Sequence, residues 1–437
     1  MSPMAPLKPR FAGLRNVFCM SKAGPSAAAQ STTRAAKVIA RCRELASISD
    51  TPGETSRLFL TPATRDAHTL LSWWIRQAGL EARTDDSGSL RAVRRSAHTN
   101  APTLLLFSHI DTVPDAGAFD GPLGVVLALA AIEELHNTTL PFNIEIIAFS
   151  EEEGVRFSFP FLSSLAATGQ LTPEHLARTD AEGITLAQAI RNFGLNPDRI
   201  AETCSLPANT FAAIEVHIEQ GPVLEADAAS LAVVEAIVGQ SRFQLTFEGH
   251  ANHAGTTPMS LRHDALAAAA QWIVEVERYA ASYTQLVATV GHIDAFPGAA
   301  NVVPGKVSVT LDVRHPRDES RHAAVAHLLT KAESAGALRG VTVHARLQSE
   351  QKAVPMDHAL VQHLHQAAGR AGFATQSMFS GAGHDAMIVA PHLPTAMLFV
   401  RSPGGLSHHP DETVREQDVE AALATVLNFL LHLHPHA

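Results

Sequence analysis

The stretch TLLLFSHIDTVPDAGAFDGPLGVVLALAAIEELHNTTLPFNIEIIAFSEEEG, residues 103–154, contains the pattern that decides the fold. Residues 103–107 and 143–150 are short apolar runs with the length of buried strands. Between them, residues 121–136 stay apolar over a length that predicts a helix. A strand, a helix and a strand at this spacing predict a βαβ unit with a right-handed crossover. The unit in turn predicts a parallel sheet that helices cover.

The middle of the chain has a different pattern. We expect strands over residues 241–249, 285–295, 305–315 and 341–348, and helices over residues 262–280 and 320–334. Apolar and polar residues alternate within residues 307–313, which is typical of a sheet with one open face. The middle therefore reads as a compact α+β unit.

Helix and strand patterns return after this unit and can complete the first sheet. We predict an α/β fold in which a mostly parallel sheet domain is formed by residues 35–237 and 349–437. An α+β domain, residues 238–348, is inserted between these two pieces. The length of 437 residues is consistent with two domains.

Charge and cysteine content exclude several classes of protein. The formal net charge is −10, and outside the first 43 residues the chain carries 25 basic against 43 acidic residues. Such an acidic body is a poor match for nucleic acid. No run of 18 apolar residues predicts a membrane span. Three cysteines without a C-x-x-C pair indicate a reducing compartment, and we expect a cytoplasmic protein.

The N-terminal segment is basic, free of acidic residues and rich in Ser, Ala and Pro. We expect residues 1–34 to be a disordered basic extension, or translation to begin at Met20. An organelle transit peptide is the alternative.

Ionisable residues follow the predicted strands at the points where they end. His109 comes just after residues 103–107, and three glutamates, Glu151 to Glu153, close residues 143–150. Ligands of open α/β sheets bind beyond the carboxyl ends of the strands, so we expect these side chains to face one another. Asp120, at the amino end of the intervening helix, can reach the same edge.

Two further histidines have similar positions. His217 is near the end of an apolar strand pattern, and His384 is in a Gly-rich loop before an apolar helix. Imidazoles and carboxylates together suit zinc, manganese, cobalt or nickel. An aspartate between two such ions can bridge them.

Seven motifs carry a resemblance to a known family. In order they are SHIDTVPDAGAFDGPLGV, FSEEEGVRF, HIEQGPVLE, GHANHAGTTPMSLRHDA, NVVPGKVSVTLDVRH, SGAGHDAM and GGLSHHPDE. From about residue 36 to the C-terminus, the chain resembles the allantoate amidohydrolase and N-carbamoyl-L-amino-acid hydrolase family. That family belongs to the dinuclear metallo-hydrolases related to aminoacylase and carboxypeptidase G.

The resemblance implies two divalent metal ions per subunit, Zn or Mn, with Co or Ni as alternatives. The terminal ligands that it implies are His109, Glu153, His217 and His384, and Asp120 is implied as the bridging ligand. It further implies that Glu152 is the general base that takes a proton from the attacking water, with Glu151 beside the ligands.

Substrate contacts follow from the same resemblance. Arg314 and Asn301 are implied to bind the substrate carboxylate and the group under attack, and Gln220 is a further pocket residue. His253 is implied to reach the active site across a homodimer and to stabilise the developing oxyanion. His408 could equally be an orienting or a structural residue. The inserted domain would serve as a lid and dimerisation domain on the catalytic sheet domain.

The expected activity is hydrolysis of a linear C–N bond of a ureido or carbamoyl acid. Allantoate is the first choice, with ureidoglycolate, ammonia and CO2 as products in purine catabolism. N-carbamoyl-L-amino acids or β-ureidopropionate are the alternatives. A dipeptidase or aminoacylase activity and a metal-free dimeric binding protein on the same scaffold are more remote ones.

Overall fold

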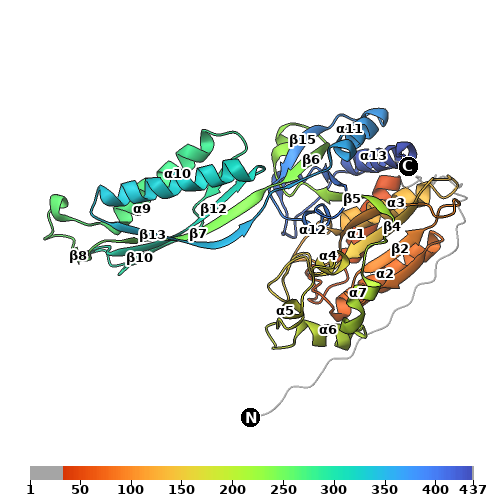
Figure 1. Ribbon diagram of the computed structural model, residues 1–437, viewed down its shortest axis with the longest axis horizontal. Helices are drawn as coiled ribbons and strands as arrows, with labels where there is room; N and C mark the ends of the chain where they lie inside the picture. Colours follow the sequence, from red (N-terminus) through yellow and green to blue (C-terminus); the bar gives the residue numbers. More distant parts are fainter. Residues whose placement is uncertain (1–32, 436–437) are drawn as a thin grey trace, which may run out of the picture. The chain divides into compact units, whose positions relative to one another are not determined.

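A computed structural model of the chain describes residues 33–435, and the prediction for the N-terminal extension lies almost wholly outside them. The larger sheet runs in the order β1-β2-β4-β3-β5-β16-β6-β14, and β15 also pairs with β6 (Figure 1). Its strands are β1 (Glu81–Thr84), β2 (Leu90–Arg94), β3 (Thr103–His109), β4 (Asn143–Phe149), β5 (Thr210–Ile218), β6 (Leu231–Ile237), β14 (Val354–Pro355), β15 (Gln376–Ser380) and β16 (Thr395–Val400).

The four central strands, β4, β3, β5 and β16, are mutually parallel, and the strands flanking them on either side, β2 and β6, run antiparallel to them. The expected α/β class with a parallel-containing sheet is confirmed. Because the central strands run the same way, their carboxyl ends meet at one edge. This edge receives the segments that follow β3, β4, β5 and β16.

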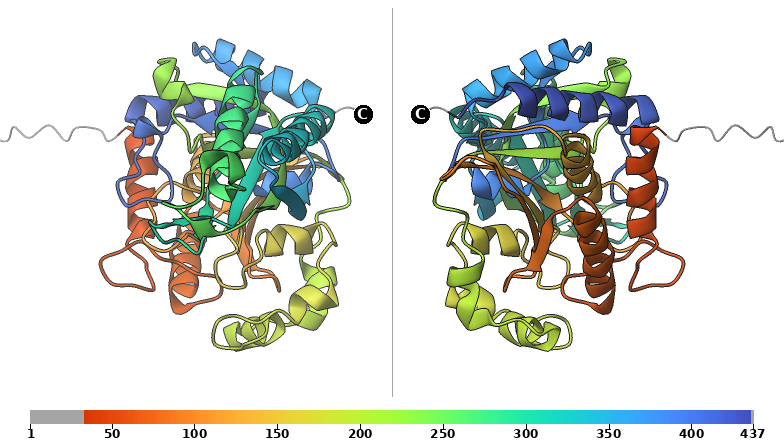
Figure 2. Two further views of the ribbon diagram at one scale, coloured as in Figure 1. Left: turned by 90° about the vertical axis from the view of Figure 1, so that its left-hand side faces the viewer. Right: turned by 90° about the vertical axis from the view of Figure 1, so that its right-hand side faces the viewer.

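Helix α3 (Pro122–Glu134) connects β3 to β4 and is apolar on every side. All residues from Pro122 to Ile132 are buried. The helix packs between the sheet and two other helices, α1 (Arg34–Ala46) and α13 (Glu416–His432). Figure 2 shows α13, in dark blue, beside α1, in red. A helix enclosed in this way has no polar face to present, which explains the continuous apolar run.

The remaining helices around the larger sheet are α2 (Pro62–Gln77), α4 (Leu162–Ala167), α5 (Pro173–Leu176), α6 (Leu186–Phe193), η1 (Pro197–Arg199), α7 (Ile200–Thr203), α8 (Val223–Ala226), α11 (His358–Arg370), α12 (Asp385–Val389) and η3 (Pro403–Gly405). Helices α4 to α7 lie in the connection between β4 and β5. Phe157, Leu162 and Phe193 belong to a separate small core beside this connection.

A second, smaller sheet has the order β10-β12-β7-β13, and β9 also pairs with β12. Its elements are β7 (Gly239–Glu248), β9 (Val287–Thr289), β10 (Ile293–Phe296), β12 (Lys306–His315) and β13 (Thr342–Gln351), and the helices beside it are α9 (Ala265–Ala281) and α10 (Asp318–Ala337). Both helices lie along the same face of this sheet (Figure 1). The expected alternation in β12 is confirmed, because every second residue from Val307 to His315 is buried.

The expected single strand over residues 285–295 is wrong. The structure has two strands there, β9 and β10, and both pair with β12. Thr289 lies opposite Asp312, whereas Ile293 lies opposite Val309, so the register shifts by one residue between them. An extra residue of this kind bends a strand and interrupts the ladder.

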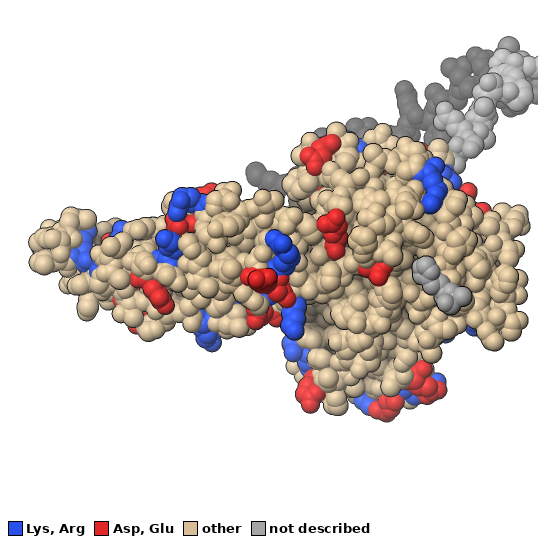
Figure 3. Space-filling model, turned by 45° about the horizontal axis from the view of Figure 1, so that its top comes forward, with Lys and Arg blue, Asp and Glu red and all other residues tan. Residues whose placement is uncertain are grey.

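The strands β8 (Asn252–His253) and β11 (Val302–Val303) form a separate two-stranded ladder, and η2 (Met259–Leu261) follows β8. No helix within residues 33–435 is long and apolar enough to cross a bilayer. On the face drawn in Figure 3, basic and acidic side chains lie next to one another. The division into domains at residues 34, 237 and 348 stays a prediction.

Candidate metal centre

Three predicted residues meet where β3 and β5 end. His109 is the last residue of β3, and His217 is the next to last of β5, its parallel neighbour. Asp120 lies just before α3, and Gly121 follows it with φ of 82°. A Cβ atom at Gly121 would lie 2.5 Å from the His109 ring, so glycine allows this close approach.

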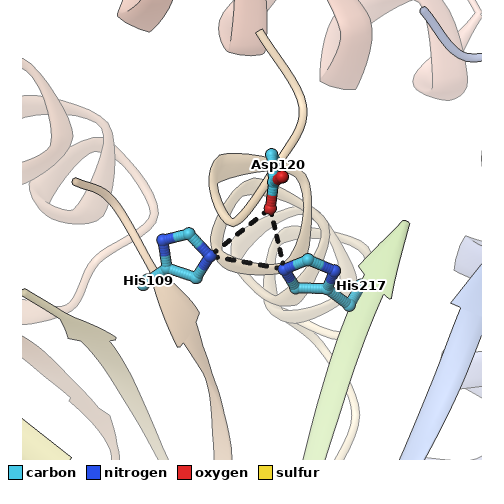
Figure 4. A group of neighbouring side chains, drawn as sticks. All are labelled: His109, Asp120 and His217. Carbon is cyan, nitrogen blue, oxygen red and sulfur yellow. Dashed lines mark hydrogen bonds and ion pairs between the residues drawn. The ribbon is translucent and has the colours of Figure 1, made fainter. Parts of the chain in front are cut away.

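The two imidazoles point one ring nitrogen each toward the other, and the carboxylate of Asp120 lies beside both (Figure 4). His109 Nε2 and His217 Nε2 are 3.3 Å apart, and they lie 3.6 Å and 3.2 Å from Asp120 Oδ1. The Nδ1 atoms lie 3.1 Å and 2.9 Å from the backbone oxygens of Asp111 and Ile218. Each Nδ1–H therefore donates to a carbonyl, and each Nε2 turns its lone pair toward the other. A divalent cation between them would remove this repulsion and accept both lone pairs.

A second group of ligand atoms shares the same aspartate. His408 Nε2 lies 3.3 Å from Asp120 Oδ2 and 3.3 Å from Glu153 Oε1. The two carboxylates raise the pKa of His408 to about 10. The two oxygens of Asp120 thus face two different sets of ligands. This is the arrangement that a carboxylate bridging two cations requires.

The three consecutive glutamates have three different environments. Glu151, with φ of 58°, accepts a hydrogen bond from Phe157 N at 2.9 Å through Oε1. Glu152 and Glu153 together bring carboxylate oxygens within 4.8 Å of a His109 ring nitrogen. The left-handed turn at Glu151 ends the strand, so the next two side chains point toward the cluster. One glutamate thus supports the turn, and two face the site.

Burial raises the pKa of Glu152 well above its ordinary value, and the nearby carboxylate of Glu153 adds to the rise. Burial also raises the pKa of Asp385, a fully buried carboxyl next to His384, to about 7. Glu215, in β5, has its pKa raised by burial as well, and its Oε2 accepts from Ala386 N at 2.9 Å. Neither Glu215 nor Asp385 was among the residues expected at the site.

The donor set fits divalent metal ions. Asp120 Oδ1 and Glu153 Oε1 are buried and receive no hydrogen bond from any described residue. Imidazole and carboxylate donors of this kind suit zinc and the neighbouring transition metals.

Residues 105–432 match the model of Peptidase family M20/M25/M40. The chain belongs to this family. The matched region contains both groups of ligand atoms.

Several known proteins are similar in sequence or structure to this chain over most of its length. Allantoate deiminase 2 of Glycine max is 37% identical over 91% of this chain and 89% of its own length. An N-carbamoyl-L-amino acid amidohydrolase of Geobacillus stearothermophilus is 37% identical over 86% of this chain and 93% of its own. The crystal structure of a hydantoinase/carbamoylase family amidase from Burkholderia multivorans superposes with a TM-score of 0.85. It is 33% identical and covers 91% of this chain and 97% of that chain.

His384 belongs to neither of the two groups of ligand atoms. Its ring packs 4.5 Å from the His217 ring, but its Nε2 lies 2.9 Å from Ser380 Oγ. Among residues 33–435, His408 and not His384 completes the group around Asp120 Oδ2 and Glu153. The ligand role expected for His384 stays a prediction, and its buried ring lies near His217 and Asp120.

The end of strand β16 is the sequence signal that points to His408. β16 is parallel to β5, so the segment after Val400 lies at the same edge as His217. The apolar residues 395–400 precede the motif GGLSHHPDE by a few residues, so the same rule of strand ends places this motif at the edge with His217.

The predicted substrate residues fall into two places. Gln220, with φ of 58°, donates from Nε2 to Asp120 Oδ2 at 2.8 Å, and its buried Oε1 receives no hydrogen bond within the described chain. His253 and Asn301 are brought together by the β8–β11 ladder, and both are exposed. Neither has a recorded hydrogen bond or ion pair with the ligand groups of residues 33–435.

Arg314 lies at the end of β12, opposite Gln240. Its Nε and Nη2 each lie 3.0 Å from an oxygen of Asp312, and its Nη1 donates to Gly381 O at 2.6 Å. Gly381 is in the loop that leads to His384, so this guanidinium lies against the larger sheet. It borders a cavity of about 590 Å³.

Proposed function

We propose that this protein is a metal-dependent amidohydrolase that uses water to cleave a linear C–N bond of a ureido acid, with allantoate as the preferred substrate. The observation that carries the proposal is the pair of ligand groups that share Asp120 beside the buried Glu152. Membership of the M20 family and relatives named for allantoate and N-carbamoyl amino acids support it.

Two divalent ions are assigned to the two groups. His109, Asp120 and His217 would hold one ion, and Asp120 and Glu153 would hold the other, with the buried His384 beside His217 as the further expected ligand. When bound, such ions lower the pKa of water and polarise a carbonyl group. Zinc or manganese is our first assignment.

Glu152 acts as the general base. Its carboxylate takes a proton from the attacking water and delivers it to the leaving nitrogen as the C–N bond breaks. Hydrolysis of a ureido carbonyl then gives an amine and a carbamate, which decomposes to ammonia and CO2. The neighbouring Glu151 has no part in this step because its carboxylate is engaged with Phe157 N.

Three groups recognise the substrate. The free acceptor Gln220 Oε1 suits the N–H groups of a ureido function, which donate hydrogen bonds. Arg314 suits the substrate carboxylate, since a guanidinium binds a carboxylate through two parallel hydrogen bonds. Asp312 already holds this guanidinium in a fixed orientation.

His253 and Asn301 complete the site from a second subunit of a homodimer. Both residues are exposed and adjacent, and exposed apolar side chains lie on the same part of the chain, among them Met259 and Leu261 at 77% and 64% exposure. Exposed apolar groups of this kind mark interaction surfaces. We assign the enzyme to the cytoplasm.

N-carbamoyl-L-amino acids are the second candidate substrates. The Geobacillus relative named for them is as similar to this chain, at 37% identity, as the first allantoate relative. Both substrates offer a ureido group and a carboxylate, so the same residues can bind either one.

Ammonia release tests the proposal. The purified protein is stripped with a chelator, reloaded with Zn²⁺ or Mn²⁺ and offered allantoate and a panel of N-carbamoyl-L-amino acids in parallel. We expect turnover only after metal is restored, with allantoate turned over fastest. A faster reaction with an N-carbamoyl amino acid would reassign the substrate. Binding of no metal would overturn the proposed function.

A further inference from the structure

Asp312, in β12, is shared by two arginines. Its carboxylate accepts from Nε and Nη2 of Arg314, both at 3.0 Å, and its Oδ2 also accepts from Arg242 Nε at 3.0 Å. Gln240, a buried residue of β7, donates from Nε2 to the same Oδ2 at 2.8 Å. β7 pairs with β12, and Arg242 lies directly opposite Asp312 in this pairing. Two adjacent strands thus hold the aspartate between two guanidiniums.

The two arginines border the same cavity, the one of about 590 Å³ described above. Among the described residues that line it, only Arg242, Asp312 and Arg314 are charged. Two guanidiniums against one carboxylate leave one positive charge in excess. Without Arg242, the pair of Arg314 and Asp312 would be neutral. The excess charge of the cavity therefore depends on Arg242.

The cavity extends from the second sheet to the loop before His384. Gly381 of this loop lines the cavity, and its carbonyl oxygen accepts from Arg314 Nη1 at 2.6 Å. The side chains of Arg242 and Arg314 are 53% and 32% exposed. A small anion can therefore reach both guanidiniums without displacing a buried group.

A carboxylate that approaches Arg314 also approaches Asp312, because the two side chains are in contact. Burial acts to raise the pKa of Asp312, but the contacts with Arg314 and Arg242 lower it, so this carboxyl stays ionised. Attraction by Arg314 and repulsion by Asp312 then largely cancel. Arg242 offsets the charge of Asp312, and the attraction of Arg314 for an anion is restored.

We propose that Arg242 is a positioning residue that acts through Asp312: it supplies the excess positive charge of this cavity and thereby sets the affinity for the carboxylate of the substrate. It has no part in the chemical step. The inference rests on the proposed function, in which Arg314 binds that carboxylate. A single charge in a half-exposed site changes the affinity for an anion by about 3- to 10-fold.

Steady-state kinetics of ammonia release by the metal-loaded enzyme tests this inference. The probes are allantoate and its methyl ester, which keeps the ureido groups and removes the charge. If the assay above selects an N-carbamoyl-L-amino acid instead, that acid and its methyl ester are used. Arg242→Gln keeps an amide that can donate to Asp312 and removes only the charge. We expect its KM for the acid to rise about 3- to 10-fold, with kcat and the KM for the ester nearly unchanged.

Two further variants separate charge from structure. Arg242→Lys keeps the positive charge, so we expect most of the affinity for the acid to be rescued. Arg278→Gln is the matched control. It removes an arginine charge from α9 of the same sheet region, where Arg278 pairs with Glu275 at 2.7 Å and is 73% exposed. Because Arg278 does not line the cavity, we expect both KM values to be unchanged.

Salt provides a measurement that needs no variant. The wild-type KM for the acid should rise with NaCl concentration while that for the ester stays constant, because salt screens charges at partly exposed sites. Calorimetric binding of the acid to metal-loaded Glu152→Gln gives dissociation constants without turnover, and these should follow the same trend.

An unchanged KM of Arg242→Gln for the acid, or an equal rise for acid and ester, would overturn the inference and leave the proposed function intact. A wild-type KM for the acid that does not depend on salt would also overturn it. A metal-loaded wild type that hydrolyses no ureido acid would overturn the proposed function, and the inference with it.

Discussion

The ionisable residues beside the two sheets differ in burial. At the carboxyl edge of the larger sheet, His109, Asp120, Glu152 and His217 are all buried and contact or face one another. Around the second sheet, His253 and Asn301 are exposed, and Arg314 is half-buried against Asp312. One region assembles its site from its own strands, whereas the other offers two exposed groups, His253 and Asn301, and a guanidinium held by Asp312.

This difference assigns the two regions different tasks. A buried cluster of carboxylates and imidazoles has fixed geometry and is suited to chemistry. Exposed residues on a separate sheet are suited to meeting a substrate or a second subunit. Changes in the first region should therefore alter the rate of the chemical step, and changes in the second should alter substrate binding or depend on assembly.

The largest effect is expected for Glu152→Gln. Loss of a general base should lower kcat by about 10²- to 10⁴-fold because the amide cannot take a proton. Both ions should stay bound, as metal analysis of the purified variant would check. The neighbouring Glu151→Ala should keep most of the activity and lose about 1–3 kcal/mol of stability, because Phe157 N is left unpaired. The reverse pattern would contradict the roles given to the triplet.

The choice between His408 and His384 is expected to have the next largest effect. His384→Ala should reduce the metal content from two ions per chain to one, because it removes the buried imidazole expected to hold the second ion. His408→Ala should keep both ions, since its side chain is 47% exposed at the edge of the cluster. Metal content after dialysis distinguishes the two variants. A protein that loses an ion only in His408→Ala would place His408, and not His384, among the ligands.

Arg314→Lys tests the second region. Lysine cannot make two parallel hydrogen bonds to a carboxylate, so KM should rise about 10- to 100-fold with a much smaller change in kcat. Steady-state kinetics with the preferred substrate would measure this split. A fall in kcat at constant KM would place Arg314 in the chemical step and break the distinction between the two sheets.

Mixing two inactive variants gives the smallest but most specific signal. His253→Ala and Glu152→Gln should each be weakly active alone. If His253 acts across a homodimer, random reassociation should restore roughly a quarter of the wild-type activity, since half of the dimers then contain one intact site. No recovery, in a sample shown by light scattering to have exchanged subunits, would confine His253 to its own subunit.

The sequence by itself determined the framework of this protein. Apolar runs of strand and helix length gave β3, α3 and β4, because burial on both faces of a parallel sheet requires continuous apolar residues. The rule that ligands bind at strand ends then brought His109, Asp120, Glu153 and His217 to one edge. These inferences need only local periodicity and chain direction.

Tertiary structure alone decided the finer points. His408 and His384 both follow strands of the same sheet, and only the packing of the two loops shows that His408 contacts Asp120 while His384 contacts Ser380 and His217. Likewise, Glu412 is one acidic residue among many until its carboxylate is seen on the backbone of Asp120, far away in the sequence. Side-chain direction and hydrogen bonds between distant segments depend on how the loops pack, and no local pattern in the sequence encodes that.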